Sequence, residues 1–163
     1  MKTKLIWKKG LFSNTFLIYS GEGLVGSLNE KTFSKTARGE LNGQKYTFRM
    51  KGVFNQTTEL LNQDNRVIGQ ITYGRWRSNA TLSIPGQTVF WKYDNMWNTR
   101  WKIFNHEGME IRYSGSSSSG TIASNTDDPL LLMSGLFVIN YYRQVSIAVF
   151  VAIFVPIMAS ITH

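Results

Sequence analysis

The residues able to do acid, base or metal chemistry are few and isolated in this sequence. His106 precedes Glu107 in a stretch expected to be a hairpin tip, and His163 closes the sequence. Neither histidine has a second histidine at ligand spacing, nor a serine motif that it could activate. We therefore expect His106 to be a solvated turn residue rather than a catalytic base.

Other chemical motifs are equally sparse. Asp127-Asp128 could be a pair of calcium ligands, but without an Asx-rich loop the pair suits helix capping better. The serine run 116–119 lies in no nucleophile motif, and phosphate-binding or dinucleotide-binding glycine patterns are missing. The sequence has no cysteine. We expect no metal, no cofactor and no enzymatic activity.

Three short clusters combine basic and aromatic residues: Trp7-Lys8-Lys9, Arg75-Trp76-Arg77 and Arg100-Trp101-Lys102. A nucleic-acid-binding protein would use such clusters to neutralise phosphates and stack bases. On a strand, however, alternation places the tryptophan on one face and its two basic neighbours on the other. We favour inward tryptophans with solvated flanking charges and do not expect a nucleic-acid partner, although a soluble nucleic-acid-binding barrel remains the alternative.

The positive charge of the chain is unevenly distributed. The formal net charge is +8, and residues 1–51 carry ten Lys and Arg against three Glu. Residues 52–128 hold equal numbers of both signs, and Arg143 supplies the last charge. Each basic residue near an anionic leaflet gains about 1 kcal/mol, so this excess favours a membrane surface.

The elements that would carry these residues are mostly strands. Up to position 126, short aromatic and β-branched runs alternate with Gly, Asn, Asp and Ser every 8–12 residues, which is typical of an all-β meander. The runs predict twelve strands: Lys4–Lys8, Thr15–Ser20, Leu24–Asn29, Ser34–Leu41, Gln44–Lys51, Val53–Leu61, Arg66–Tyr73, Asn79–Ile84, Thr88–Tyr93, Thr99–Asn105, Glu110–Ser114 and Thr121–Ser124.

A helix is expected after the last strand. Asp128 is a good N-cap, Pro129 suits the first helical position, and the following residues are apolar on every face. The uncharged run Pro129–Tyr142 is shorter than the ~20 residues of a membrane span, so it predicts a buried core helix. Its expected core residues are Leu131, Leu132, Leu136, Phe137 and Ile139.

The strand count and the helix fit together. Twelve tilted strands close at a radius of roughly 12 Å, which leaves room for a helix ~10–12 Å across on the barrel axis. We therefore predict an all-β protein with one C-terminal helix: a closed antiparallel barrel of about twelve strands around a central hydrophobic helix, residues 129–143. The strands are too short for an outer-membrane barrel.

This pattern resembles the tubby C-terminal-like superfamily, in particular its LURP-one-related and phospholipid-scramblase-like branches. The hairpin phrases LNQDNRVIGQITY and IFNHEGMEIRYSG and the helix phrase DDPLLLMSGLFVINYYR are similar to the hairpins and terminal helix of those proteins. The small residues Ser134 and Gly135 and the aromatic Tyr141 and Tyr142 are part of this likeness, which covers residues 1–143.

The resemblance implies binding of anionic phospholipid headgroups by basic surface residues. The residues that we expect to contact headgroups are Lys2, Lys4, Lys8, Lys9 and Arg143. No acidic calcium-binding segment like that of the scramblases precedes the helix, which disfavours calcium-dependent lipid transfer but leaves scramblase-like transfer as an alternative.

The segment 144–163 extends beyond the usual end of that family. Val145–Ile161 can just cross a thinned bilayer, with Pro156 tolerated inside the helix, and Arg143 stands where a cytoplasmic positive charge is expected. Because the N-terminal stretch lacks the apolar core of a signal peptide, we expect a membrane-anchored barrel on the cytoplasmic side. In the competing interpretation, 145–161 folds back on the barrel or forms an interface with another subunit or a protein partner.

Overall fold

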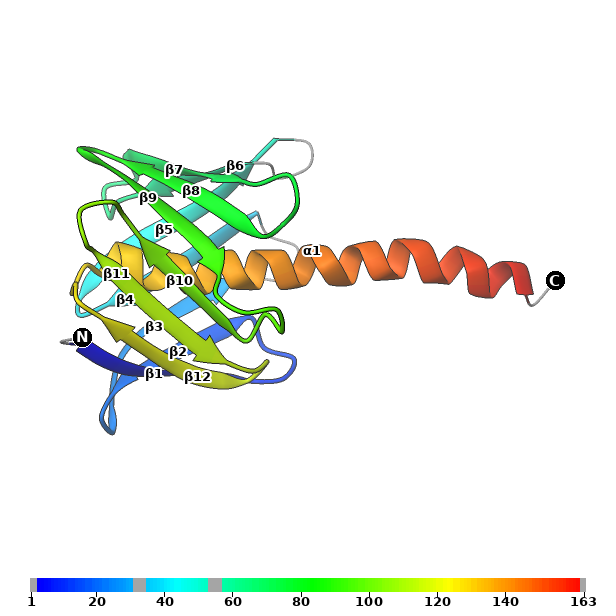
Figure 1. Cartoon of the computed structure of the whole chain (residues 1–163), viewed down its shortest axis with the longest axis horizontal. Helices are drawn as coiled ribbons and strands as arrows, with labels where there is room; N and C mark the ends of the chain where they lie inside the picture. Colours follow the sequence, from blue (N-terminus) through cyan, green and yellow to red (C-terminus); the bar gives the residue numbers. More distant parts are fainter. Residues whose placement is uncertain (1–2, 31–34, 53–56, 162–163) are drawn as a thin grey trace.

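The computed structural model describes residues 3–30, 35–52 and 57–161. In these residues twelve strands form a closed antiparallel barrel, and a single helix, α1 (Pro129–Ile161), begins inside it. Figure 1 shows α1 passing through the barrel and continuing far beyond it as a rod. The predicted fold class is confirmed.

The strands follow the chain as a meander, and each pairs with the next. The barrel closes because β1 also pairs with β12, with Leu5 opposite Ile122 and Trp7 opposite Gly120. The strand bounds are β1 Thr3–Lys9, β2 Thr15–Ser20, β3 Gly23–Glu30, β4 Thr36–Leu41, β5 Gln44–Lys51, β6 Thr57–Leu61, β7 Val67–Tyr73, β8 Asn79–Ile84, β9 Gln87–Tyr93, β10 Arg100–Phe104, β11 Glu110–Gly115 and β12 Ser119–Ser124.

Most predicted strand ranges agree with these bounds to within two residues. Ser34 and residues 53–56, expected to begin two of the strands, lie outside the described residues. The serine-rich loop is shorter than expected, because Ser119 and Gly120 already pair with Lys8 and Trp7. The Asn and Gly residues between strands form tight turns; in Asn42-Gly43, for example, φ is 52° and 79°, as a two-residue hairpin turn with two positive φ angles requires.

The inward side chains alternate along each strand, as a closed barrel requires. In β10, Trp101 and Ile103 are fully buried, whereas Arg100 points to solvent. Trp7 in β1 is buried in the same way. The inward interpretation is therefore confirmed for Trp7 and Trp101, but it is wrong for Trp76, which lies in the loop between β7 and β8 with 84% of its surface exposed.

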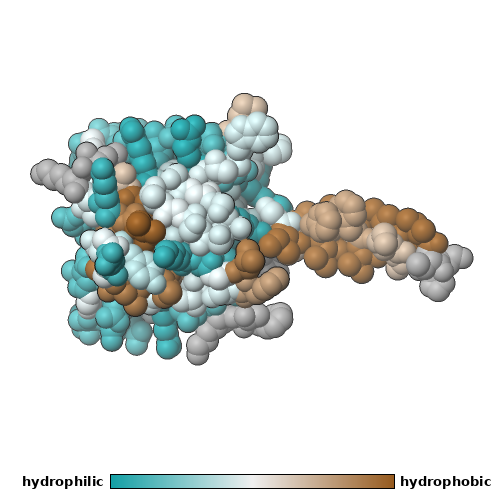
Figure 2. All heavy atoms as spheres, turned by 90° about the horizontal axis from the view of Figure 1, so that it is seen from below, coloured by the Kyte–Doolittle hydropathy of each residue, from teal (hydrophilic) through white to brown (hydrophobic). Residues whose placement is uncertain are grey.

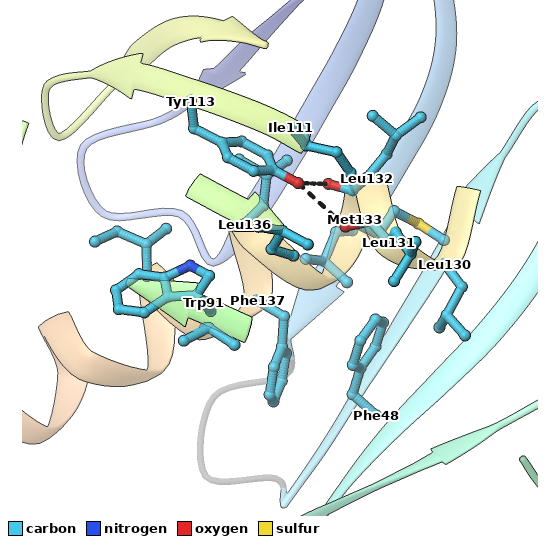
Figure 3. Packing of buried hydrophobic residues seen from close by; sticks show 14 of the residues in the cluster. Phe48, Trp91, Ile111, Tyr113, Leu130, Leu131, Leu132, Met133, Leu136 and Phe137 are labelled. Carbon is cyan, nitrogen blue, oxygen red and sulfur yellow. Dashed lines mark hydrogen bonds between the residues drawn. The ribbon is translucent and has the colours of Figure 1, made fainter. Parts of the chain in front are cut away.

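The inner part of α1 fills the barrel. Every residue from Pro129 to Tyr142 is buried, including the predicted core residues Leu131, Leu132, Leu136, Phe137 and Ile139. The ring of Phe137 stacks on Phe48 of β5, with centroids 4.6 Å apart (Figure 3). A helix buried on all sides needs apolar residues all round, which explains why this run shows no amphipathic stripe.

Aromatic side chains of the barrel strands donate hydrogen bonds to backbone carbonyls of α1. Trp91 and Trp101 both donate their indole N–H to the carbonyl of Gly135, at 3.3 and 3.0 Å. The hydroxyl of Tyr113 donates to the carbonyls of Leu131 and Leu132, as the dashed lines in Figure 3 show. These bonds satisfy the polar atoms of large buried aromatics and fix the height of α1 in the barrel.

The start of α1 is capped as predicted. The Asp128 carboxylate accepts hydrogen bonds from the backbone N–H of Leu130 and Leu131, at 2.9 and 3.3 Å. Its neighbour Asp127 accepts a hydrogen bond from the hydroxyl of Thr3 on β1. The acidic pair thus caps the helix and ties its first turn to the wall.

The outer part of α1 is very different. The helix continues without interruption from the buried segment to Ile161, through Pro156, and its side chains beyond Gln144 are almost all exposed. Figure 2 shows this segment as a hydrophobic rod projecting from a largely hydrophilic body. The part of the helix from Val145 to Ile161 is called the rod below.

Candidate functional site

The two ends of the barrel are defined by the path of α1. The helix enters at the end where β12 stops and leaves at the opposite end, the mouth, as Figure 1 shows. In an antiparallel meander alternate loops share an end. The described loops at the mouth are therefore 10–14, 74–78, 94–99 and 116–118, and those at the entry end are 21–22, 42–43, 62–66, 85–86, 105–109 and 125–128.

The two ends of the barrel differ in charge: the entry end is mainly acidic and the mouth is mainly basic. In the entry-end loops and the strand residues that flank them, one basic residue, Arg66, accompanies the acidic Glu22, Asp64, Glu107, Glu110, Asp127 and Asp128. Among the described residues of the mouth loops and the strand ends that flank them, the acidic Glu30 and Asp94 accompany the basic Lys9, Lys35, Lys51, Arg75, Arg77 and Arg100. Arg143 of α1 adds a further positive charge at the mouth, so the barrel is polarised along its axis.

The predicted headgroup residues are only partly brought together. Lys8 and Lys9 end β1 at the mouth, close to where Arg143 leaves the barrel. Lys4 lies ~13 Å back along the same strand, toward the entry end, where it pairs with Ala123. Lys2 lies outside the described residues.

A small polar cluster lies just inside the mouth. The Glu30 carboxylate, 6% exposed, accepts hydrogen bonds from the amides of Asn140 and Gln144. Burial raises the pKa of Glu30, and the two amides and Lys9 partly oppose that rise. Burial and the neighbouring Arg143 lower the pKa of Lys9. The cluster thus combines two cations with one carboxyl where α1 leaves the barrel.

Arg143 is partly withdrawn into the mouth rather than fully solvated. Its guanidinium carbon lies 5.5 Å from the ring centroid of Trp101, a cation–π contact. Burial lowers the pKa of Arg143, yet a guanidinium stays protonated at neutral pH. The positive charge of Arg143 therefore lies at the mouth and not on the rod.

A groove opens beside α1 on the β6–β7 side of the mouth. Its volume is about 810 Å³, and its walls include two arginines, three tyrosines and two valines of the rod: Arg75, Arg77, Tyr73, Tyr141, Tyr142, Val145 and Val149. Tyr73 and Tyr141 stack with ring centroids 3.8 Å apart. Burial raises the pKa of Tyr142 to about 12, so its hydroxyl stays neutral and donates to the carbonyl of Asn79.

The chemistry of this groove suits an amphipathic anion. Both arginines are exposed, and within the part of the chain that the structure describes neither forms a salt bridge. No carboxylate lines the groove. Guanidinium groups bind phosphate with paired hydrogen bonds, and the valines offer an apolar wall for a hydrocarbon chain.

Sequence reasoning did not select Arg75 and Arg77 as headgroup residues. The signal for them was available, because the order of an antiparallel meander puts the loop after every odd strand at the end from which the helix leaves. Applying it would have grouped both arginines with Lys9 and Arg143 and would have set Lys4 apart.

The other candidate residues show no such arrangement. His106 is exposed in an entry-end loop, with its ring 5.1 Å from that of Phe90. Among residues 3–30, 35–52 and 57–161, no group of three His, Asp or Glu side chains is placed to hold a metal ion. The mouth is therefore the candidate functional site.

Known proteins add no further constraint. Comparison of the chain with protein-family models, with curated proteins and with solved structures gives no match in any of the three. The tubby-like resemblance stays a prediction, and any function has to be argued from the barrel, its polarised charge and its projecting helix.

Proposed function

We propose that this protein is a non-catalytic, tubby-like barrel that the rod anchors in a membrane and that binds anionic phospholipid headgroups at its mouth. One observation carries the anchor. By length and composition α1 is the one described helix able to cross a membrane, and the 18-residue window that qualifies has a mean hydropathy of 2.3 and no buried residue. A core helix would bury that window.

The distribution of side chains on the rod supports lipid as its surroundings. Apolar residues occur all round it, so a partner packed on one side would leave the others in water. Exposed members include Ile147, Phe150, Ile153 and Val155, at 64%, 58%, 52% and 60%. Burying apolar surface stabilises by about 25 cal/mol per Å², so a bilayer that covers every side gains most.

Length and charge suggest an orientation. From Val145 to Ile161 the rod rises about 25 Å, slightly less than a hydrocarbon core of ~30 Å, which local thinning can match. The basic mouth would then lie at the headgroups of the leaflet that the rod enters. Positive charges flanking a span favour the cytoplasmic side, so we place the barrel there.

Headgroup binding is supported by the mouth itself. Arg75, Arg77, Lys9 and Arg143 provide positive charge beside an apolar wall, and the acidic entry end would point away from the membrane. A protein partner within the membrane would meet the same surface. Scramblase-like lipid transfer and nucleic-acid binding have no comparable observation in their favour.

Membrane extraction tests the anchor. The full-length protein should stay in the membrane pellet at alkaline carbonate pH and enter solution only with detergent, whereas a protein truncated after Gln144 should be a soluble, folded monomer. Release of the intact full-length protein by carbonate would refute the anchor, and so would unfolding of the truncated protein.

Vesicle binding tests the headgroup site. The truncated protein should bind vesicles containing phosphatidylserine more tightly than neutral vesicles, with an affinity that falls as salt rises. An Arg75→Gln/Arg77→Gln variant should lose most of this preference, while a Lys4→Gln variant, changed at the other end of β1, should keep it. Equal binding by both variants would contradict the assignment to the mouth.

A further inference from the structure

Large hydrophobic side chains are exposed chiefly at the mouth. Of the eight that are exposed among the described residues outside α1, three lie elsewhere on the barrel: Ile6, Leu24 and Val67. The other five belong to mouth loops, with exposures from 74% to 102%, and are called the rim: Leu11, Phe12, Trp76, Met96 and Trp97. Among the described residues outside α1, the exposed Phe and Trp side chains all belong to the rim, and the entry-end loops have none.

The rim residues come from three hairpins. These hairpins join β1 to β2, β7 to β8 and β9 to β10, so they are spread around the opening through which α1 leaves. Side chains this apolar are seldom left in water together unless another surface covers them.

The groove beside α1 shows how far the β7–β8 loop of the rim extends along the rod. Arg75 and Arg77 flank Trp76, and they line the same groove as Val145 and Val149. The β7–β8 loop therefore stands level with the first turn of the rod. Val145 to Val149 is a rise of about 6 Å, so this loop reaches roughly that far along the apolar segment.

This overlap restricts where along α1 the hydrocarbon core of the bilayer can begin. If the hydrocarbon began only past Val149, the remaining helix to Ile161 would span about 18 Å, far below the ~30 Å of a typical core. If it begins near Val145, the span is about 25 Å, and the β7–β8 loop must then lie within the interfacial layer.

We infer that the rim is immersed in the interfacial region of the bilayer that the rod enters, so that the barrel sits mouth-down on the membrane instead of standing off it. This inference rests on the proposed anchor and goes beyond it, because an anchor alone leaves the barrel free above the surface. The occupant of the rim is lipid.

The chemistry of the mouth matches that occupant. Tryptophan is enriched at the level of the headgroups, where its apolar ring and its polar N–H are both accommodated. Arg75 and Arg77 beside Trp76 would reach phosphates at the same depth. A second copy of the chain would instead set one positively charged mouth against another, which disfavours self-association through this face.

Tryptophan fluorescence in vesicles tests the inference. Of the five tryptophans, Trp7, Trp91 and Trp101 are fully buried, so Trp76 and Trp97 provide the accessible signal. In full-length protein reconstituted in phosphatidylcholine and phosphatidylserine, lipids brominated near the headgroup should quench that signal, and aqueous acrylamide should quench it poorly. A Trp76→Phe/Trp97→Phe variant should lose the lipid-quenched component.

A second measurement avoids any change of tryptophan. Because the chain has no cysteine, a single cysteine can carry a nitroxide label at Phe12→Cys or Met96→Cys, with Glu107→Cys at the entry end as the matched control. Rim labels should be accessible to oxygen and shielded from a water-soluble nickel complex, and the control should show the reverse.

The outcomes separate this inference from the anchor. Protein that resists carbonate extraction, but whose rim labels and tryptophans are as accessible to water as the Glu107 label, overturns the rim inference and leaves the anchor standing. Concentration-dependent cross-links between rim cysteines, with no lipid quenching, overturn it in favour of a second copy. Protein released by carbonate refutes the anchor itself.

Discussion

Gly135 is the position at which the barrel should be most sensitive to a single added methyl group. A Cβ atom at this residue would stand 2.1 Å from Cζ and 2.4 Å from the hydroxyl oxygen of Tyr113. Ordinary carbon contacts are ~3.5–4.0 Å, so in Gly135→Ala the tyrosine ring must retreat by more than ~1 Å. Tyr113 is 2% exposed and stacks on Trp101 with centroids 5.6 Å apart, so it has no space to enter.

The expected cost of Gly135→Ala follows from these contacts. Overpacking a close-packed core costs about 1–3 kcal/mol, and displacing the Tyr113 hydroxyl from its helix carbonyls adds about 1 kcal/mol. Replacing a helical glycine by alanine returns about 1 kcal/mol. We therefore expect a net loss of about 2 kcal/mol in the free energy of unfolding, which lowers Tm by ~4–8 °C in a chain of this size.

Thermal unfolding of the full-length protein in detergent, followed by tryptophan fluorescence, measures this loss. Gly23→Ala is the matched control, because its nearest heavy atom would be Ser20 O at 3.6 Å, an ordinary contact. Replacing Tyr113 by leucine in the Gly135→Ala protein should restore part of the loss, so that the two changes are not additive. A Gly135→Ala protein that melts within about 1 °C of the wild type would show that the packing around α1 is not as tight as described.

Three further changes test the core, the cap and the mouth. Phe137→Asp puts a charge against Phe48 at a cost of several kcal/mol and should abolish the folded barrel, whereas Phe137→Leu should fold. Native-like melting of the aspartate variant would contradict the burial of the inner part of α1 in the barrel. Asp128→Ala should cost about 1 kcal/mol in chemical unfolding and Asp128→Asn much less, because only alanine removes both backbone hydrogen bonds. Since burial raises the pKa of Glu30, the folded state favours its protonated form, so the free energy of unfolding should fall as pH rises from 4.5 through the folded-state pKa. Glu30→Gln should remove that slope in pH-dependent unfolding, and an unchanged slope would assign it to other groups.

The barrel and its helix were predictable because their signals are local. Turn residues such as Asn42-Gly43 set the hairpins, and the Asp128-Pro129 pair marked the start of the helix to the residue. The size of a twelve-strand barrel then placed the helix inside. Each of these inferences needs only the neighbouring residues and elementary geometry.

The candidate site was harder to predict because it depends on which loops share an end. Trp76 and Trp101 each stand between two basic residues, yet Trp76 lies in a loop and Trp101 on a strand, and the triplet alone does not distinguish them. Lys4 and Lys8 are four residues apart on β1, and they lie toward opposite ends of the barrel. A count of charges along the sequence does not detect which charges share an end of the barrel, because it ignores the direction in which each strand runs.

The continuity of α1 has a mechanical consequence. The same 33-residue helix is the core of the barrel and the projecting rod, with no intervening loop. A hinge would let the two parts reorient independently, whereas an unbroken helix held by Tyr113, Trp91 and Trp101 transmits rotation. Under the proposed membrane anchor, any tilt of the rod in the bilayer would therefore turn the barrel, and with it the rim, through the same angle.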